Sequence, residues 1–288
     1  MFDTPDKTAI VAHDAGAANI IIAWIDAGLL PQERVYLEGP AATLWDSRAR
    51  RSRLPSLDAA FEGAQALITG TGWGSDLEHA ARRIARKREL RSIAVLDHWV
   101  NYAVRFERAG ETLLPDEIWV TDEYAEAMAR DVFPGLPLHR APNTYLSAEV
   151  GRITEPRDGR ELLYILEPAR SDWGRDKLGE FQALDFFVER LGELKLPGET
   201  RLRLRPHPSD PAGKYDEWIA RHNHLDIEMA ASEPLSDAIS RASTVVGCNS
   251  FALVVALAAG RRVVCTLPPW APACYLPHRG LIQLKDLA

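Results

Sequence analysis

Short apolar segments alternate with stretches of helical period along the N-terminal half of the chain. Strands are expected at residues 9–12, 34–37, 66–68, 92–96 and 117–121, and helices at 17–27, 75–88 and 123–131. Strands that are apolar on both faces and joined by helices form parallel sheets covered on both sides. This half therefore predicts an α/β fold.

The alternation restarts in the C-terminal half, after a polar segment rich in glycine and proline. Strands are expected at 162–166, 200–205, 225–229, 244–247 and 262–267, and helices at 175–194, 214–221, 234–241 and 250–259. We therefore predict two Rossmann-like domains, 1–148 and 161–288, joined by a linker at 149–160. Their parallel sheets would face one another across a cleft, where the carboxyl ends of the strands bind ligands.

Composition narrows the class of protein. A formal net charge of −7 and a pI near 5.7 argue against a nucleic-acid binder, which carries a basic face. No secretion signal begins the chain, and no apolar run reaches the ~20 residues that span a bilayer. The three cysteines suit neither a disulfide framework nor a zinc site. A cytoplasmic protein is expected, with peripheral membrane association left open.

The segment after the expected strand 244–247 has the chemistry of a phosphate site. Asn249 and Ser250 stand where an apolar helix begins, and a helix N-terminus attracts anions. Helix capping alone also explains a serine there. His207 lies between two prolines at the end of another strand, directly after Arg205. We predict that these four residues contact a phosphate.

Two stretches of the C-terminal half resemble the donor half of GT-B glycosyltransferases: RLRLRPHPSD, and SDAISRASTVVGCNSFALVVALAAGRRVVCTLPP. The closest resemblance is to the branch with a His-Pro motif and a downstream Ser motif. That branch contains bacterial sialyltransferases, polysialyltransferases, Kdo transferases and CDP-glycerol glycerophosphotransferases. The resemblance implies that His207 and Ser250 hold the phosphate of a nucleotide.

Two clusters at strand ends of the N-terminal half suit general-base chemistry, which an inverting transfer requires. The first, HDAGAAN, contains Asp14, with Gly16 letting backbone N–H groups approach a ligand; an ordinary turn explains it equally. The second begins with Asp97 and His98, and a core or capping role is its alternative. It resembles the Asp-Asp-Gly or Glu-Asp-Gly motif of the CMP-sialyltransferases, in which only Asp97 matches. Asp97 is the first choice as base, His98 the second and Asp14 the third. Further residues expected in the cleft are Asn101, Tyr102, Arg105 and Glu167.

The leading functional hypothesis is an inverting GT-B glycosyltransferase. It would move a sugar, with Kdo or another nonulosonate favoured, from a CMP-activated donor to a glycan or glycolipid acceptor of the cell surface. The nucleotide sugar is a substrate, and neither a cofactor nor a metal is expected, since no Asp-x-Asp motif occurs. A sugar-nucleotide epimerase or hydrolase and a non-catalytic nucleotide-sugar-binding module are the alternatives.

Overall fold

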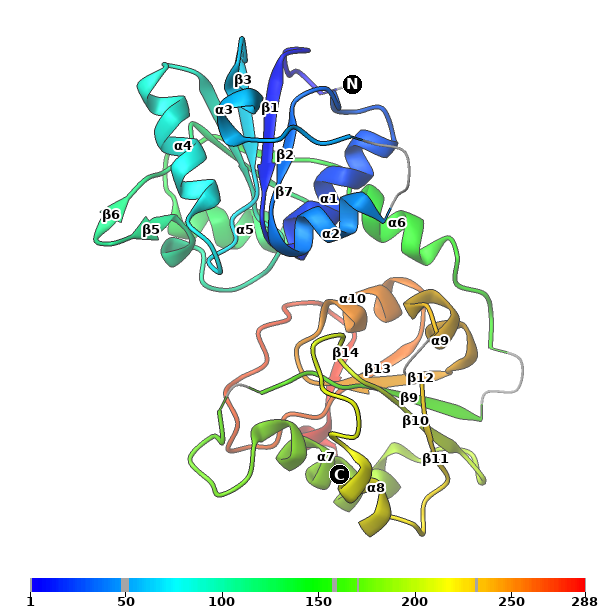
Figure 1. Cartoon of the computed structure of the whole chain (residues 1–288). Coiled ribbons are helices and arrows are strands. Elements are labelled where there is room, and N and C mark those ends of the chain that lie inside the picture. The colour runs from blue at the N-terminus through cyan, green and yellow to red at the C-terminus, as the bar shows by residue number, and fades with distance from the viewer. Residues whose placement is uncertain (1, 48–51, 157–159, 170, 231–232, 288) are drawn as a thin grey trace. The chain divides into compact units, whose positions relative to one another are not determined.

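The computed structural model describes residues 2–47, 52–156, 160–169, 171–230 and 233–287. Residues 157–159 of the expected linker lie outside this part. The chain forms two compact units, Met1–Tyr145 and Leu146–Ala288 (Figure 1). In the described residues, no helix has the length and apolar character needed to cross a membrane.

The first unit contains a parallel sheet, six-stranded in the described part, with the order β2-β1-β3-β4-β7-β8. Its strands are β1 (Thr8–Ala12), β2 (Val35–Leu37), β3 (Ala66–Thr69), β4 (Arg91–Val95), β7 (Glu117–Val120) and β8 (Leu138–Arg140). A short antiparallel hairpin, β5 (Glu107–Arg108) and β6 (Glu111–Thr112), lies between β4 and β7 in sequence.

Helices cover both faces of this sheet (Figure 1). They are α1 (Ala15–Asp26), α2 (Gly39–Asp46), α3 (Leu57–Phe61), α4 (Leu77–Lys87) and α5 (Glu123–Val132). A 3-10 turn, η1 (Ala103–Phe106), follows β4, and α6 (Thr144–Val150) spans the point in the sequence where the first unit ends. Ile10 and Ala12 of β1 belong to a core with α1 and α2, whereas Ala9 and Val11 pack with α3 and α4. The apolar strands of the sequence are therefore buried on both sides.

The second unit repeats this architecture with the strand order β11-β10-β9-β12-β13-β14, again in the described residues. Its strands are β9 (Glu161–Ile165), β10 (Arg201–Arg205), β11 (Ile227–Met229), β12 (Thr244–Gly247), β13 (Arg262–Cys265) and β14 (Leu281–Gln283). Helices α7 (Gly179–Glu189) and α8 (Asp216–Arg221) cover one face, and α9 (Leu235–Arg241) and α10 (Phe251–Ala258) the other (Figure 1). The predicted fold class, two Rossmann-like parallel sheets, is confirmed.

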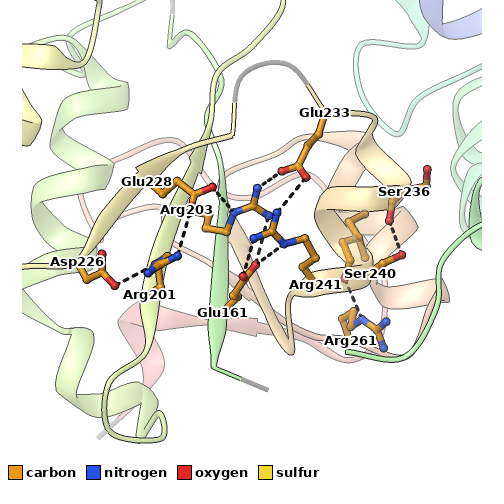
Figure 2. A network of polar contacts seen from close by, with 11 residues as sticks. Glu161, Arg201, Arg203, Asp226, Glu228, Glu233, Ser236, Ser240, Arg241 and Arg261 are labelled. Carbon is orange, nitrogen blue, oxygen red and sulfur yellow. Dashed lines mark hydrogen bonds and ion pairs between the residues drawn. The ribbon is translucent and has the colours of Figure 1, made fainter. Parts of the chain in front are cut away.

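The face of β10 that meets α9 is charged, because arginine alternates with leucine along this strand. Leu202 and Leu204 enter the core beside α7 and α8. On the other face Arg203, only 2% exposed, is ion-paired with Glu161, Glu228 and Glu233 (Figure 2). A buried guanidinium needs such compensation. The network thus ties together β9, β10, β11 and the segment before α9.

Two features of this unit differ from the sequence prediction. The helix expected at 175–194 is shorter: α7 begins at Gly179 and is followed by a separate 3-10 turn, η2 (Leu191–Leu194). Gln182 explains the late start, because its side-chain amide donates a hydrogen bond to the carbonyl of Lys177 at 2.6 Å and holds the preceding loop. The short strand β14 is missed, since three residues carry no periodic signal.

Candidate functional site

The carboxyl edge of the first sheet is divided at β1. The chain runs from β1 to β2 on one side and then crosses to β3 on the other side of β1. The strand order therefore reverses between β1 and β3. Such a switch point opens a crevice between the loops that follow the neighbouring strands. His13 and Asp14 follow β1, and the glycine-rich loop 70–74 follows β3. Sequence reasoning placed the cluster that contains His13 and Asp14 here but did not single out the glycine-rich loop.

His13 and Asp14 form a hydrogen-bonded pair at this crevice. The distance between His13 Nδ1 and Asp14 Oδ1 is 2.7 Å. Both side chains remain partly accessible to solvent. A Cβ atom at Gly72 would lie 2.3 Å from Asp14 Oδ2, so the loop after β3 packs directly on the carboxylate. The pair is therefore held in place from two strand ends.

Glu78, at the start of α4, holds the backbone of this pair in position. One carboxyl oxygen, Oε1, accepts a hydrogen bond from the backbone N–H of His13 at 2.9 Å. The other, Oε2, is buried and has no hydrogen-bond partner among the described residues. Burial raises the pKa of Glu78. No sequence pattern indicates this role, since a glutamate in an amphipathic helix usually lies on the solvent side.

Asp97 follows β4 and lies against the N-terminus of α1. Its Oδ1 accepts a hydrogen bond from Arg105 Nη1 at 2.8 Å, and Arg105 also donates to Thr71 Oγ1 at 3.2 Å. A Cβ atom at Gly16 would lie 1.7 Å from Asp97 Oδ2. Three residues singled out from the sequence, Gly16, Asp97 and Arg105, are thus brought together, with Asp97 Oδ1 in the ion pair and Asp97 Oδ2 packed against Gly16.

His98, Tyr102 and Asn101 have different surroundings. The N–H of Trp99 donates to His98 Nδ1 at 2.9 Å, and burial lowers the pKa of His98. The imidazole is therefore neutral with its proton on Nε2, which cannot accept a second proton from a substrate. Tyr102 is buried and its pKa is raised by burial, whereas Asn101 is exposed at a φ of 61°. Contacts of Asn101 and Tyr102 with an acceptor stay predictions.

Trp73 lies in the glycine-rich loop and is 49% exposed. The guanidinium carbon of Arg105 lies 5.8 Å from the centre of its ring. An indole held open to solvent beside polar groups provides a surface on which a sugar ring can stack. The run GTGWGS at a strand end is the sequence signal that marks it.

The second sheet has its own switch point, between β9 and β12. Glu167 follows β9, and its Oε1 accepts a hydrogen bond from the backbone N–H of Asn249 at 2.9 Å. Burial raises the pKa of Glu167 to about 7. Asn249 in turn accepts a hydrogen bond on Oδ1 from the N–H of Tyr275 at 3.1 Å. The carboxyl group is therefore an integral part of the loop that follows β12.

Ser250 is the N-cap of α10, as predicted. Its Oγ accepts a hydrogen bond from the N–H of Ala252 at 3.2 Å. The first turn of α10 directs its N–H groups and the positive end of the helix dipole toward the carboxyl edge of the sheet. The position suits an anion, and the phosphate contact of Ser250 itself stays a prediction.

His207 lies exposed in the loop after β10. The N–H of Ser209 donates to His207 Nδ1 at 3.2 Å, so a neutral ring carries its proton on Nε2 and can donate from there. Asp210 anchors the loop by accepting from the N–H of His207 at 3.0 Å and from Lys214 Nζ at 2.6 Å. Because β10 and β12 flank β9, their ends lie about 10 Å apart, with Glu167 between them.

Arg205 has a structural partner instead. Its Nη1 donates to the backbone carbonyl of Glu233 at 2.6 Å, and burial lowers its pKa. The side chain points to the α9 face because it shares the alternation of Arg203. The guanidinium has further N–H donors, and the phosphate contact of Arg205 stays a prediction.

Comparison with known proteins identifies the fold. No family model matches the sequence, and no curated protein matches it. Solved structures do match. A protein assigned as a UDP-N-acetylglucosamine 2-epimerase of Listeria monocytogenes is 11% identical, with a TM-score of 0.60 over 89% of this chain and 78% of that one. S. aureus MnaA in complex with UDP is 12% identical (TM-score 0.58, 90% and 78%). The glycotransferase of kitacinnamycin is 14% identical (TM-score 0.54, 98% and 87%). The chain therefore has a GT-B-like fold.

Proposed function

We propose that this protein is an enzyme acting on a nucleotide-activated sugar, and that it transfers the sugar with inversion. The observation that carries the proposal is the pairing, in one chain, of two complementary sites. A carboxylate site occupies the switch point of one sheet, and an anion site occupies that of the other. The fold, shared with structures described as a glycotransferase and as bound to UDP, supports it.

The donor phosphate would be held by the N-terminus of α10 beside Ser250, and by His207 donating from Nε2. The phosphate gains negative charge as the bond to the sugar breaks, so hydrogen-bond donors placed there stabilise the transition state. Glu167, when protonated, adds an O–H donor between them. CMP stays the nucleotide suggested by the motifs, with CDP and UDP as competitors.

The base would be Asp14. One of its oxygens is held by His13, and the side chain remains accessible. Asp97, the first choice from the sequence, is ion-paired with Arg105 through Oδ1, and its side chain is 14% exposed, against 32% for Asp14. A neutral His98 carries its proton on Nε2, because its Nδ1 accepts from Trp99. Asp97 is therefore better suited to hold Arg105 and the start of α1 in position. Asp14 would remove the proton from the acceptor hydroxyl, and Trp73 would stack on the acceptor sugar.

Calorimetric titration with CMP, CDP and UDP tests the donor site. The substitution His207→Ala should lower the affinity for the preferred nucleotide about 10- to 100-fold, which is the contribution of one hydrogen bond to a charged group. The exposed His224→Ala serves as the matched control and should bind normally. Equal affinity in His207→Ala and the wild type, or no binding of any nucleotide, would overturn the proposal.

A sugar-nucleotide epimerase is the second candidate, because one of the similar structures is assigned that activity. Incubation with the nucleotide sugar alone separates the two. An epimerase or hydrolase converts the donor without an acceptor, whereas a transferase needs a glycan acceptor for turnover. Binding with no conversion under either condition would indicate a non-catalytic module.

A further inference from the structure

The three cysteines, which lie close together in the last part of the chain, converge at the loop that carries Asn249. Cys265 ends β13, and its Sγ lies 3.3 Å from the backbone oxygen of Cys248. Cys274, in the segment between β13 and β14, places its Sγ 3.8 Å from the same oxygen. The sulfur atoms of Cys265 and Cys274 therefore lie beside the same carbonyl oxygen. All three are free thiols.

The two paired thiols differ in environment. Cys265 is fully buried, whereas Cys274 is only half-buried. The neighbouring thiol of Cys265 lowers the pKa of Cys274, and the backbone N–H of Leu276 contributes in the same direction. The same thiol pair raises the pKa of Cys265. Cys274 is therefore the better nucleophile, and Cys265 is placed to react with it in a second step.

We propose that Cys265 and Cys274 are an oxidation site that closes into a disulfide on reaction with a hydroperoxide. The Cys274 thiolate, whose proton has passed to solvent, attacks one oxygen of hydrogen peroxide, and the O–O bond breaks. Cys274 becomes a sulfenic acid, and the departing hydroxide takes up that proton and leaves as water. The sulfur of Cys265 then attacks that of Cys274, the S–O bond breaks, and a second water carries away the hydroxyl group and the Cys265 proton. Two electrons pass from the thiols to the peroxide.

Formation of the disulfide would alter the anion site through the hydrogen bond between Tyr275 and Asn249. A disulfide requires about 2.05 Å between the sulfur atoms, so Cys274 must approach Cys265 and leave the oxygen of Cys248. The neighbouring N–H of Tyr275 donates to Asn249 Oδ1 at 3.1 Å, and this bond must adjust with it. Oxidation therefore reshapes the loop between β12 and α10. The effect on nucleotide binding rests on the proposed function, whereas disulfide formation does not.

Peptide mapping after treatment with hydrogen peroxide tests the disulfide. Both cysteines fall on one tryptic peptide, residues 263–279, so the bond appears as a loss of two hydrogens from that peptide. The thiol count of the denatured chain should fall from three to one. Cys248→Ala should preserve this result, and Cys265→Ser should abolish it. A covalent dimer, a disulfide that includes Cys248, or an unmodified Cys274 would overturn the proposal.

Nucleotide affinity before and after oxidation tests the coupling. We expect roughly a tenfold loss in the oxidised wild type, which dithiothreitol reverses, and no loss in peroxide-treated Cys265→Ser. Unchanged affinity in a chain with the mapped disulfide would refute the coupling. If the reduced protein binds no nucleotide while the disulfide still forms, the proposed function fails and the oxidation site stands.

Discussion

Glu167 accepts a hydrogen bond from the backbone N–H of Asn249 at 2.9 Å, at the switch point between β9 and β12 where the strand order of the second sheet reverses. The carboxyl group thus occupies the middle of the proposed anion site. Its burial raises its pKa to about 7, so its charge changes within the physiological range. A neutral Glu167 can donate to a phosphate, whereas an ionised one repels it.

We predict that nucleotide affinity falls as the pH rises through about 7. Glu167→Gln, which stays neutral, should bind with little pH dependence between pH 6 and 8. Titration calorimetry at several pH values measures this, with the exposed Glu217→Gln as the control that keeps the wild-type slope. The same slope in Glu167→Gln as in the wild type would exclude Glu167 as its source.

Glu167 should also make stability depend on pH. Its folded pKa lies above the unfolded value near 4.5, so the folded state binds the proton more tightly. The stabilisation is complete below about pH 4.5 and is lost as the pH rises through 7, by on the order of 3 kcal/mol. Urea denaturation at pH 5 and pH 8 measures the loss, which should be absent in Glu167→Gln.

The two acids of the first unit should separate in their effects. Asp14→Asn should reduce kcat about 100-fold or more, the usual contribution of a general base, with normal stability. Asp97→Asn leaves the buried Arg105 without its counter-charge and should cost about 3 kcal/mol of stability or more. Thermal unfolding and initial rates distinguish them, with the exposed Asp131→Asn as control. A stable Asp97→Asn that is inactive, beside an active Asp14→Asn, would reverse the assignment.

The close approach of Gly16 to Asp97 predicts a steric effect. Gly16→Ala places a methyl group 1.7 Å from Asp97 Oδ2, and the forced displacement should cost about 1–3 kcal/mol. Gly192→Ala is the control, because its added Cβ meets nothing within 4 Å. Equal unfolding free energies for the two variants would contradict the geometry.

The charged face of β10 predicts a contrast between neighbouring arginines. Arg203→Met leaves Glu161 and Glu233 without their buried partner and should cost about 3–5 kcal/mol (Figure 2). Arg201, 47% exposed, pairs with Asp226 and Glu228 at the surface, where solvent screens ion pairs, so Arg201→Met should lower the free energy of unfolding far less than Arg203→Met. Urea denaturation of both variants measures the difference; similar losses would contradict it.

The fold was predictable because burial on both faces leaves an unbroken apolar signature in the strands, as in Ala9–Ala12. Short elements such as α2, α3 and β8 escaped prediction, since too few residues carry their period. The cap at Ser250 was predictable for a similar reason: it is a local property of a strand, a polar residue and an apolar helix in succession.

The surroundings of the site residues were less predictable, because they depend on which strands are neighbours. The hydrogen bond from Arg205 to the backbone carbonyl of Glu233, for example, depends on the face of the strand that Arg205 occupies. Glu78 is a second example, since its role arises from α4 packing beside β1. Neither relation is written in the spacing of residues along the chain.

The fit between glycine and carboxylate in the first unit has an evolutionary consequence. A carboxylate oxygen of Asp97 occupies the space that a side chain at Gly16 would fill, and a carboxylate oxygen of Asp14 does the same at Gly72. A larger residue at either position is tolerable only if the acid beside it is shortened or displaced. Among related sequences, Gly16 should therefore vary together with Asp97, and Gly72 with Asp14, so that each pair is inherited or lost as one unit.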